Sequence, residues 1–64
     1  MENRIRELRV RENLTQENLA EILNVSRQSI SSIESNKVNP SLLIAMRIAK
    51  VFSKRVEDLF IFNK

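Results

Sequence analysis

The sequence predicts an all-α fold, a compact domain of five short helices that covers residues 1–64. Apolar residues recur three or four positions apart, which is the period of a helix with one buried face. Serine, threonine and asparagine stand at the ends of the apolar segments, where helices are capped. A chain of 64 residues buries only about 60% of its unfolded surface, so dimerisation is a common way to stabilise such a domain.

The first helix is expected at residues 3–12. Ile5 and Leu8 are three positions apart, share one face of the helix and should point inward. Asn13 should end the helix, and Leu14 should pack against the core. The charged residues expected in solvent are Arg4, Arg6, Glu7, Arg11 and Glu12.

Two helices joined by a tight turn are expected within residues 15–35. Leu19 and Leu23 are four positions apart, on one face of the first helix. Ile30 and Ile33 are three positions apart, on one face of the second helix. Each helix therefore has an apolar side to bury.

Capping residues stand at the ends of these two helices. Thr15 should cap the first helix, although Asn18 is a poorer partner for a capping box than Glu or Gln. Asn24 tolerates the left-handed conformation that ends a helix, and Ser26 is a favoured N-cap for the second. Ala20 lies where the helices approach, and a larger side chain would hold them apart. These features predict a helix-turn-helix whose second helix is offered to DNA.

The chain contains no glycine, although its helices must end. Asn13, Asn24 and Asn36 each stand directly after a helical segment, and Asn is the next-best residue for the left-handed conformation. We expect these three asparagines to stop their helices. The alternative is that they are solvated polar loop residues.

The fourth helix is expected to start at residues 39–41, Asn-Pro-Ser, because proline suits the first turn of a helix. Residues 53–55 should form a connector, residues 56–60 a short fifth helix, and residues 61–64 an extended tail. The fourth helix should bury an apolar stripe at helical spacing, made of Leu42, Ala45, Met46, Ala49 and Phe52.

Matches to a known family run along the helix-turn-helix and, more weakly, beyond it. Within the motif they are Thr15-Gln16, Leu19-Ala20, Leu23-Asn24-Val25-Ser26, Ile30 and Ile33-Glu34. Beyond it they are Asn39-Pro40-Ser41, Arg47-Ile48-Ala49-Lys50 and Val56-Glu57-Asp58-Leu59-Phe60. At these residues the chain resembles the phage Cro/cI-type (XRE) helix-turn-helix family of transcription regulators. The resemblance implies a lambda-repressor-like DNA-binding domain. The family's usual glycines are absent, and Ser53 and Arg55 stand where members often have Gly and Ser.

The exposed face of the third helix should carry Arg27, Gln28, Ser31 and Ser32, because its apolar residues point inward. Arg can fork onto guanine O6 and N7, and Gln can pair with adenine N6 and N7. Both stand at the first turn, the end that enters the major groove in this motif. The resemblance implies that Arg27, Gln28 and Ser32 read bases. The alternative is that Arg27 and Gln28 are plain surface residues, with Arg27 touching only phosphate.

Phosphate contacts are expected on the flanks of this helix. Gln16 opens the second helix, where free backbone N–H groups favour an anion. Donors beyond the third helix are Asn36, Lys37, Asn39 and Ser41. The resemblance implies that these regions grip the DNA backbone, and the alternative for Lys37 is a solvated loop lysine.

Arg9 and Glu34 match positions at which the family often has an ion pair. The resemblance implies that the pair ties the first helix to the end of the third. We expect a structural role for the pair. Its net contribution to stability is left open, because desolvation offsets the attraction in a buried pair. The alternative is two unpaired surface charges.

A dimer interface is expected at apolar residues that one small domain cannot bury. Ile44 and Val51 share a face of the fourth helix that the inward stripe does not cover, and Phe60, Ile61 and Phe62 follow one another. An uncovered apolar patch usually marks a partner surface. The resemblance implies a two-fold interface there, and hence a homodimer. The alternative is that Phe62 folds back onto its own core and the chain is monomeric.

The composition argues against several functions. Without Cys or His, no disulfide framework, zinc site or histidine base is available, and we expect neither metal nor cofactor. The serines have no evident activating base, and the small helical plan leaves no room for a deep pocket, so neither an enzyme nor a small-molecule sensor is expected. The sequence has neither a transmembrane run nor a signal-peptide pattern, which indicates the cytoplasm. The net charge of +3 and pI of about 10.0 suit a polyanion partner but are common.

The leading hypothesis is a sequence-specific regulator that binds double-stranded DNA, a repressor that binds a palindromic operator as a homodimer. Alternatives within DNA binding are an antitoxin or a restriction–modification controller. An alternative from another class is a protein-interaction module that uses the surface of the fourth and fifth helices. RNA binding is disfavoured, because no exposed aromatic platform for base stacking is evident.

Overall fold

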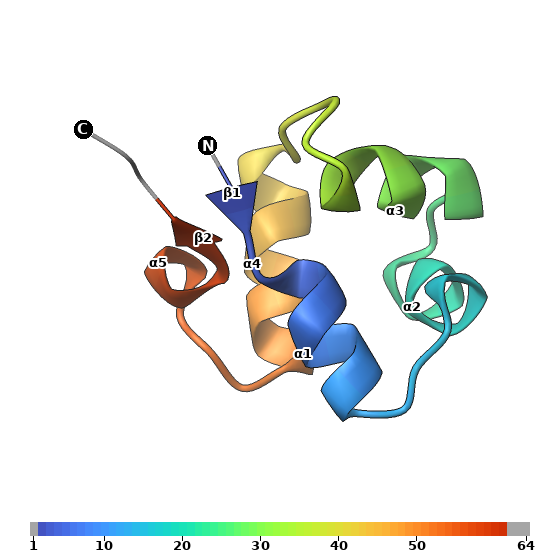
Figure 1. Ribbon diagram of the computed structural model, residues 1–64, viewed down its shortest axis with the longest axis horizontal. Helices are drawn as coiled ribbons and strands as arrows, with labels where there is room; N and C mark the ends of the chain where they lie inside the picture. The colour runs from blue at the N-terminus through green and yellow to red at the C-terminus, as the bar shows by residue number, and fades with distance from the viewer. Residues whose placement is uncertain (1, 62–64) are drawn as a thin grey trace.

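Residues 2–61 are the part of the chain that the structure, a computed structural model, describes. They form five helices and one pair of short strands (Figure 1). In chain order these are β1 (Glu2–Asn3), α1 (Ile5–Arg11), α2 (Gln16–Leu23), α3 (Arg27–Glu34), α4 (Leu42–Val51), α5 (Val56–Leu59) and β2 (Phe60–Ile61). The predicted five-helix fold is confirmed, and the strand pair is a small addition to it.

One hydrophobic core is shared by all five helices. The largest fully buried side chains are Ile5 from α1, Leu19 and Leu23 from α2, Ile30 from α3, Ile48 from α4 and Leu59 from α5. Full burial of one such side chain is worth about 1.5–3 kcal/mol. In Figure 1, α2 and α3 lie on one side of the molecule, and α5 and the strands lie on the other.

Hydroxyl side chains cap three of the helices at their N-terminal ends. Thr15 and Ser26 cap α2 and α3 as predicted, and Ser41 caps α4. Thr15 Oγ1 accepts a hydrogen bond from the Asn18 N–H at 3.0 Å, and Asn18 Oδ1 accepts one from the Thr15 N–H at 3.0 Å. Asn18 was expected to be a poorer partner, yet it completes the capping box.

Left-handed residues follow the first four helices. Asn13, Asn24 and Asn36 have φ of 59°, 57° and 63°, which confirms that they stop their helices. The backbone N–H after each asparagine donates to the carbonyl five residues earlier, at 2.9 to 3.0 Å. This bond satisfies a carbonyl that the helix leaves free. Ser53, with φ of 55°, ends α4 in the same way.

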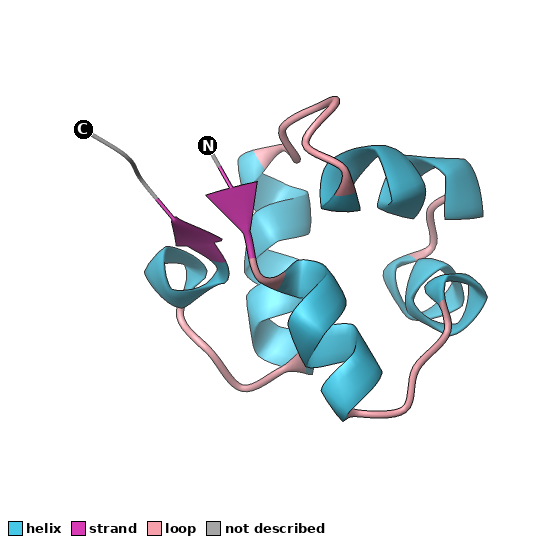
Figure 2. Ribbon diagram, in the orientation of Figure 1, coloured by secondary structure: helices cyan, strands magenta, loops and turns pink. Residues whose placement is uncertain are grey.

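The strand pair changes two predicted helix boundaries (Figure 2). Asn3 is opposite Phe60 in the antiparallel pair of β1 and β2, so α1 begins two residues later than predicted. The Arg4 N–H donates to the Leu59 carbonyl at 2.7 Å, which extends the connection to the end of α5. Helix α5 ends at Leu59 because Phe60 has an extended backbone.

The buried face of α4 differs from the predicted stripe. Leu42 is 71% exposed and Met46 54% exposed, so their assignment to the core was wrong. Ile48, which the prediction omitted, is fully buried on the same face as the predicted Ala45, Ala49 and Phe52. Nearly every residue of α4 is apolar, so the pattern alone does not fix the phase of the helix. Pro40 lies before the cap of α4, not in its first turn.

Candidate nucleic-acid interface

Helices α2 and α3 form a helix-turn-helix, with α3 along one outer edge of the molecule (Figure 1). Ala20 is only 4% exposed, and its carbonyl accepts the Val25 N–H across the turn at 2.9 Å. Ile30 and Ile33 anchor α3 in the core, at 1% and 5% exposure. The opposite side of α3 therefore faces solvent.

The predicted base-reading residues lie on this outward side of α3. Arg27 and Gln28 are exposed on its first turn, and Ser31 and Ser32 are half-buried. Gln28 Nε2 donates to Ser32 Oγ at 3.4 Å, which holds the Gln28 amide along the helix. Ser35, which was not predicted as a site residue, donates its hydroxyl to the Ser31 carbonyl at 2.9 Å. Arg27 and Gln28 supply the donors and acceptors that the base edges of the major groove require.

A buried ion pair fixes the other end of α3. Arg9 Nε lies 2.7 Å from Glu34 Oε2, and these side chains are 11% and 5% exposed. Arg9 also donates to Glu34 Oε1 at 3.2 Å and to the Leu14 carbonyl at 2.7 Å. The Gln16 side-chain amide donates to Glu34 Oε1 at 3.1 Å. The network joins α1, the start of α2 and the end of α3.

A polar hollow of about 280 Å³ lies beside this network. It is lined by Arg6, Arg9, Gln16, Ser31, Glu34 and Ser35. The side-chain carboxylate of Glu34 is already engaged, so Arg6 gives the hollow a net positive charge. From the sequence, Arg6 was expected on a solvated face of the first helix, and it is exposed. Its spacing of three from Arg9 puts both residues on one side of α1 and could have indicated this position.

The loop between α3 and α4 carries the remaining residues predicted to contact phosphate. Asn36, Lys37, Asn39 and Ser41 are all exposed. The Ser41 hydroxyl accepts a backbone N–H as the cap of α4. Asn36 Oδ1 accepts a hydrogen bond from Asn3 Nδ2 at 3.1 Å. These four residues therefore follow the C-terminal end of α3, in the loop that leads to α4.

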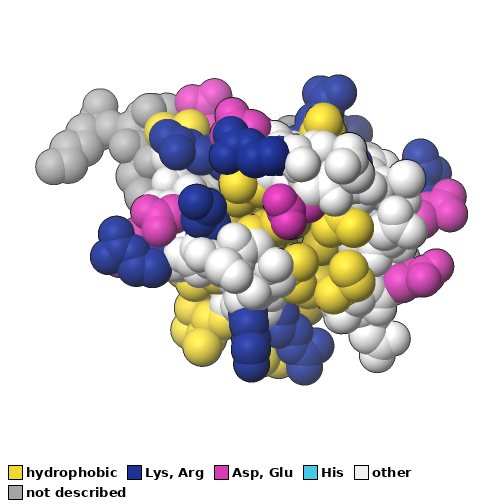
Figure 3. Space-filling view, turned by 90° about the horizontal axis from the view of Figure 1, so that it is seen from below, with side chains coloured by type: hydrophobic (Ala, Val, Ile, Leu, Met, Phe, Trp, Pro, Cys, Tyr) yellow, Lys and Arg dark blue, Asp and Glu magenta, His cyan; other side chains and the backbone are white. Residues whose placement is uncertain are grey.

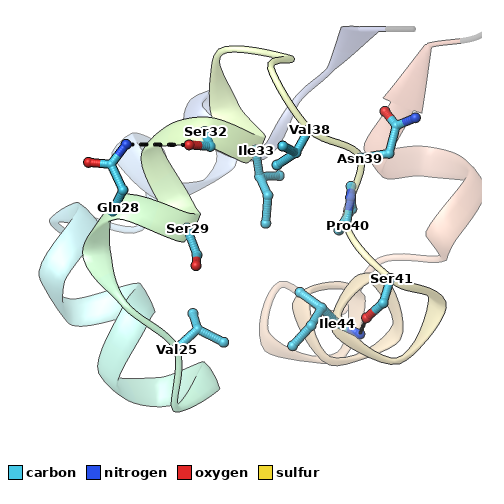
Figure 4. Close-up of a pocket in the computed structure, with 10 residues that line it drawn as sticks. All are labelled: Val25, Gln28, Ser29, Ser32, Ile33, Val38, Asn39, Pro40, Ser41 and Ile44. Atoms are coloured by element: carbon cyan, nitrogen blue, oxygen red, sulfur yellow. Dashed lines mark hydrogen bonds between the residues drawn. The ribbon is translucent and has the colours of Figure 1, made fainter.

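A groove of about 330 Å³ separates α3 from this loop and the start of α4 (Figure 4). Its apolar lining consists of Val25, Ile33, Val38, Pro40 and Ile44. Its polar lining consists of Gln28, Ser29, Ser32, Asn39 and Ser41. An apolar surface beside the predicted base-reading residues has the character that would suit the methyl group of thymine.

Charge is arranged differently on the two sides of the molecule. Seen from below, away from α3, the surface shows both Lys and Arg and Asp and Glu side chains around exposed hydrophobic groups (Figure 3). On α3 and the following loop, Arg27 and Lys37 are exposed cations. The one carboxylate of this stretch, Glu34, is buried against Arg9. The side that carries α3 thus offers positive charge to a polyanion.

The predicted dimer residues have different environments. Ile44 and Val51 are half-buried and pack against the core of their own chain. Phe60 is 8% exposed and belongs to the core of its own chain, so it offers little surface to a partner. Ile61 is 36% exposed, and Phe62 lies outside the described residues. Large apolar side chains of α4 that are more than half exposed are Leu42, Leu43 and Met46.

Within residues 2–61, no group of three or more His, Cys, Asp or Glu side chains could hold a metal ion. No helix in the same range has the length and apolar character needed to cross a membrane.

Comparison with known proteins gives consistent matches. The helix-turn-helix family model matches residues 5–59. A protein of Archaeoglobus fulgidus named as an uncharacterized HTH-type transcriptional regulator is 51% identical over 63 residues, which cover 98% of this chain and 90% of that protein. One with the same description from Methanocaldococcus jannaschii is 50% identical over 63 residues, covering 98% and 96%.

A solved structure also resembles this fold closely. The restriction-modification controller protein C.AhdI from Aeromonas hydrophila superposes with a TM-score of 0.80 and 32% sequence identity. The match covers 89% of this chain and 86% of the controller protein.

Proposed function

Because the chain belongs to the helix-turn-helix family of transcriptional regulators, we propose that it binds specific double-stranded DNA sequences through α3. The observation that carries this proposal is the contrast between exposed Arg27 and Gln28 and the buried ion pair at the other end of α3. A helix fixed in this way can present its first turn to the major groove. The relatives are named as regulators, and helix-turn-helix is not an enzyme family.

Arg27 and Gln28 are the proposed base readers, with Ser31 and Ser32 allowing a close approach to the groove. The arginine fork suits guanine, and the glutamine amide suits adenine. Ser32 is already within reach of Gln28, so it can orient that amide as well as contact a base. Selection of bound sites from random duplex DNA tests the proposal. Recovery of no preferred sequence would contradict it.

Phosphate contacts are proposed on both flanks of α3. On one flank, Gln16 and the newly placed Arg6 line a polar hollow. On the other, the loop and the cap of α4 offer Asn36, Lys37, Asn39 and Ser41. Each cation that neutralises a phosphate releases counterions, so the affinity should fall steeply with salt.

A homodimer that represses transcription by occluding a promoter is the proposed form of the regulator. Two copies related by a two-fold axis would place two α3 helices about 34 Å apart on a palindromic site. The exposed side chains of Leu43, Met46 and Ile61 support a partner surface. Sedimentation equilibrium tests this proposal. A monomer well above the concentration needed for DNA binding would contradict it.

A second candidate function is control of a restriction–modification system. The similarity to C.AhdI supports it. The neighbouring genes distinguish the two candidates, because a controller is expected beside a methyltransferase and an endonuclease. Absence of both would leave the general repressor as the better account.

A further inference from the structure

The side chain of Asn3 joins the strand pair to the end of α3. Its Oδ1 accepts a hydrogen bond from the Ile5 N–H at 3.1 Å. Its Nδ2 donates to the Ile33 carbonyl at 2.9 Å and to Asn36 Oδ1 at 3.1 Å. One amide thus satisfies the start of α1 and the end of α3, across 30 residues of sequence.

These contacts determine which way both amides point. A backbone N–H can only donate, so the atom of Asn3 that faces Ile5 must be oxygen. A backbone carbonyl can only accept, so the atom that faces Ile33 must be nitrogen. The same nitrogen donates to Asn36, so the atom of Asn36 that faces Asn3 must be Oδ1. The Nδ2 group of Asn36 is consequently directed away from Asn3.

We propose that Asn3 is a positioning residue for DNA binding, which orients the Asn36 amide so that its Nδ2 group donates to a DNA phosphate. The inference rests on the proposed function. Asn36 is exposed in the loop beyond α3 and has a left-handed backbone, which fixes the root of its side chain. An amide that turned over would offer an oxygen to the phosphate, and two acceptors cannot form a hydrogen bond.

The position of Asn3 itself depends on β2. Asn3 is opposite Phe60 in the strand pair, and the Arg4 N–H donates to the Leu59 carbonyl at 2.7 Å. Phe60 and Leu59 are both buried. The buried residues Leu59 and Phe60 therefore hold the residue that orients the proposed DNA-contacting loop.

The substitution Asn3→Asp tests the proposal with little change in shape. The carboxylate still accepts from the Ile5 N–H, but its second oxygen can donate neither to the Ile33 carbonyl nor to Asn36. The loss at Ile33 is the same whether or not residue 36 carries an amide. We expect the Asn36 amide to turn over and donate Nδ2 to Asp at position 3. The affinity for the selected operator should fall by about tenfold or more, as for the loss of a hydrogen bond to a charged group.

The variant Asn36→Ala supplies the matched background, because it keeps the added charge and removes the amide. Asn3→Asp should weaken binding much less in this background than in the wild type. Asn3→Ser is the neutral arm of the experiment, since its hydroxyl can accept from the Ile5 N–H but is too short to reach Asn36. Circular dichroism at the assay temperature ensures that only folded variants are compared.

Equal losses of affinity from Asn3→Asp in both backgrounds, or no loss in either, would overturn the proposal. The side-chain NH₂ resonances of Asn36 in the free protein give a reading that does not need DNA. They should shift in both Asn3→Asp and Asn3→Ser, and unchanged resonances would also overturn the positioning role. Failure of the wild type to bind any selected duplex would instead contradict the proposed function.

Discussion

The two ends of α3 differ in how firmly the rest of the chain holds them. At the N-terminal end, Arg27 and Gln28 are exposed, and Gln28 makes one long side-chain bond within the helix. At the C-terminal end, the buried carboxylate of Glu34 accepts bonds from Arg9 and from the start of α2. The difference separates two tasks along one helix. Changes to the side chains of the first turn should alter DNA recognition, and changes to the Arg9–Glu34 pair should alter stability.

The largest effect is expected at the fixed end. Arg9→Ala leaves the Glu34 carboxylate buried without its guanidinium, and the free energy of unfolding should fall by about 3–5 kcal/mol. Arg11→Ala is the matched control, because Arg11 pairs with Glu7 on the same helix but both side chains are more than half exposed. The control should cost less than about 1 kcal/mol. Denaturant titration measures the free energy of unfolding of both variants. Equal losses of stability would show that the buried ion pair holds α3 no more firmly than a surface pair would.

The next effect is expected at the free end. Gln28→Ala or Arg27→Ala should weaken binding to the selected operator by about 1–3 kcal/mol and relax the preference at one base position of each half-site. The free energy of unfolding should change by less than about 0.5 kcal/mol, because both side chains are exposed. Binding assays on the operator and its single-base variants provide the measurement. Wild-type affinity and preference in both variants would show that α3 does not read bases.

A smaller effect is expected on the flank of α3. Arg6→Ala should reduce the magnitude of the slope of log affinity against log salt by about 0.9, the value for one phosphate contact. Arg4→Ala removes the same charge from a different hollow, which it shares with Glu7, Arg11, Lys54 and Asp58, and should leave the slope unchanged. Identical slopes in the two variants would mean that Arg6 acts only through net charge.

The smallest effect is expected far from α3, at the start of α5. The pKa of the Asp58 carboxyl is lowered from its ordinary value of 3.8, mainly by the hydrogen bond from the Arg55 backbone N–H. The hydrogen bond from the Arg55 side chain is the second cause. A lowered pKa in the folded state stabilises the fold above the unfolded pKa, and this contribution is lost as the pH falls through the folded pKa. Asp58→Asn should therefore lower stability slightly near neutral pH and have less effect in acid. Urea titrations at neutral and acid pH provide the test. A loss of stability in Asp58→Asn that is greatest in acid would contradict a lowered pKa for the Asp58 carboxyl.

Helix caps and helix stops could be predicted from the sequence, because they depend on residues only a few positions apart. Thr15 and Ser26 cap their helices, and Asn24 and Asn36 stop them, because each acts on the backbone within a few positions. Left-handed Ser53 was harder to predict, because serine has no marked preference for that conformation.

Features that join distant parts of the chain could not be predicted in this way. Two-residue strands have no recognisable pattern, so neither the pairing of Asn3 with Phe60 nor the burial of Phe60 was foreseen. Met46 was wrongly assigned to the buried face of α4, because apolar residues occur on nearly every face of that helix. Within the candidate site, the residues on the outward face of α3 could be predicted from the helical spacing of the sequence. Arg6 reaches it from another helix. Its spacing from Arg9 indicates that the two residues share a side of α1, and the structure shows that this side lies next to α3.

On a ribosome, residues of α1 to α4 emerge before those of β2. The helix-turn-helix can therefore assemble while Asn3 still lacks its strand partner, Phe60. The pairing of these two residues closes a loop that contains nearly all of the described chain, and closing a long loop costs more entropy than closing a short one. The nascent protein should accordingly form α3 and the Arg9–Glu34 pair first, and the hydrogen bonds of Asn3 to Ile33 and Asn36 last, when β2 arrives.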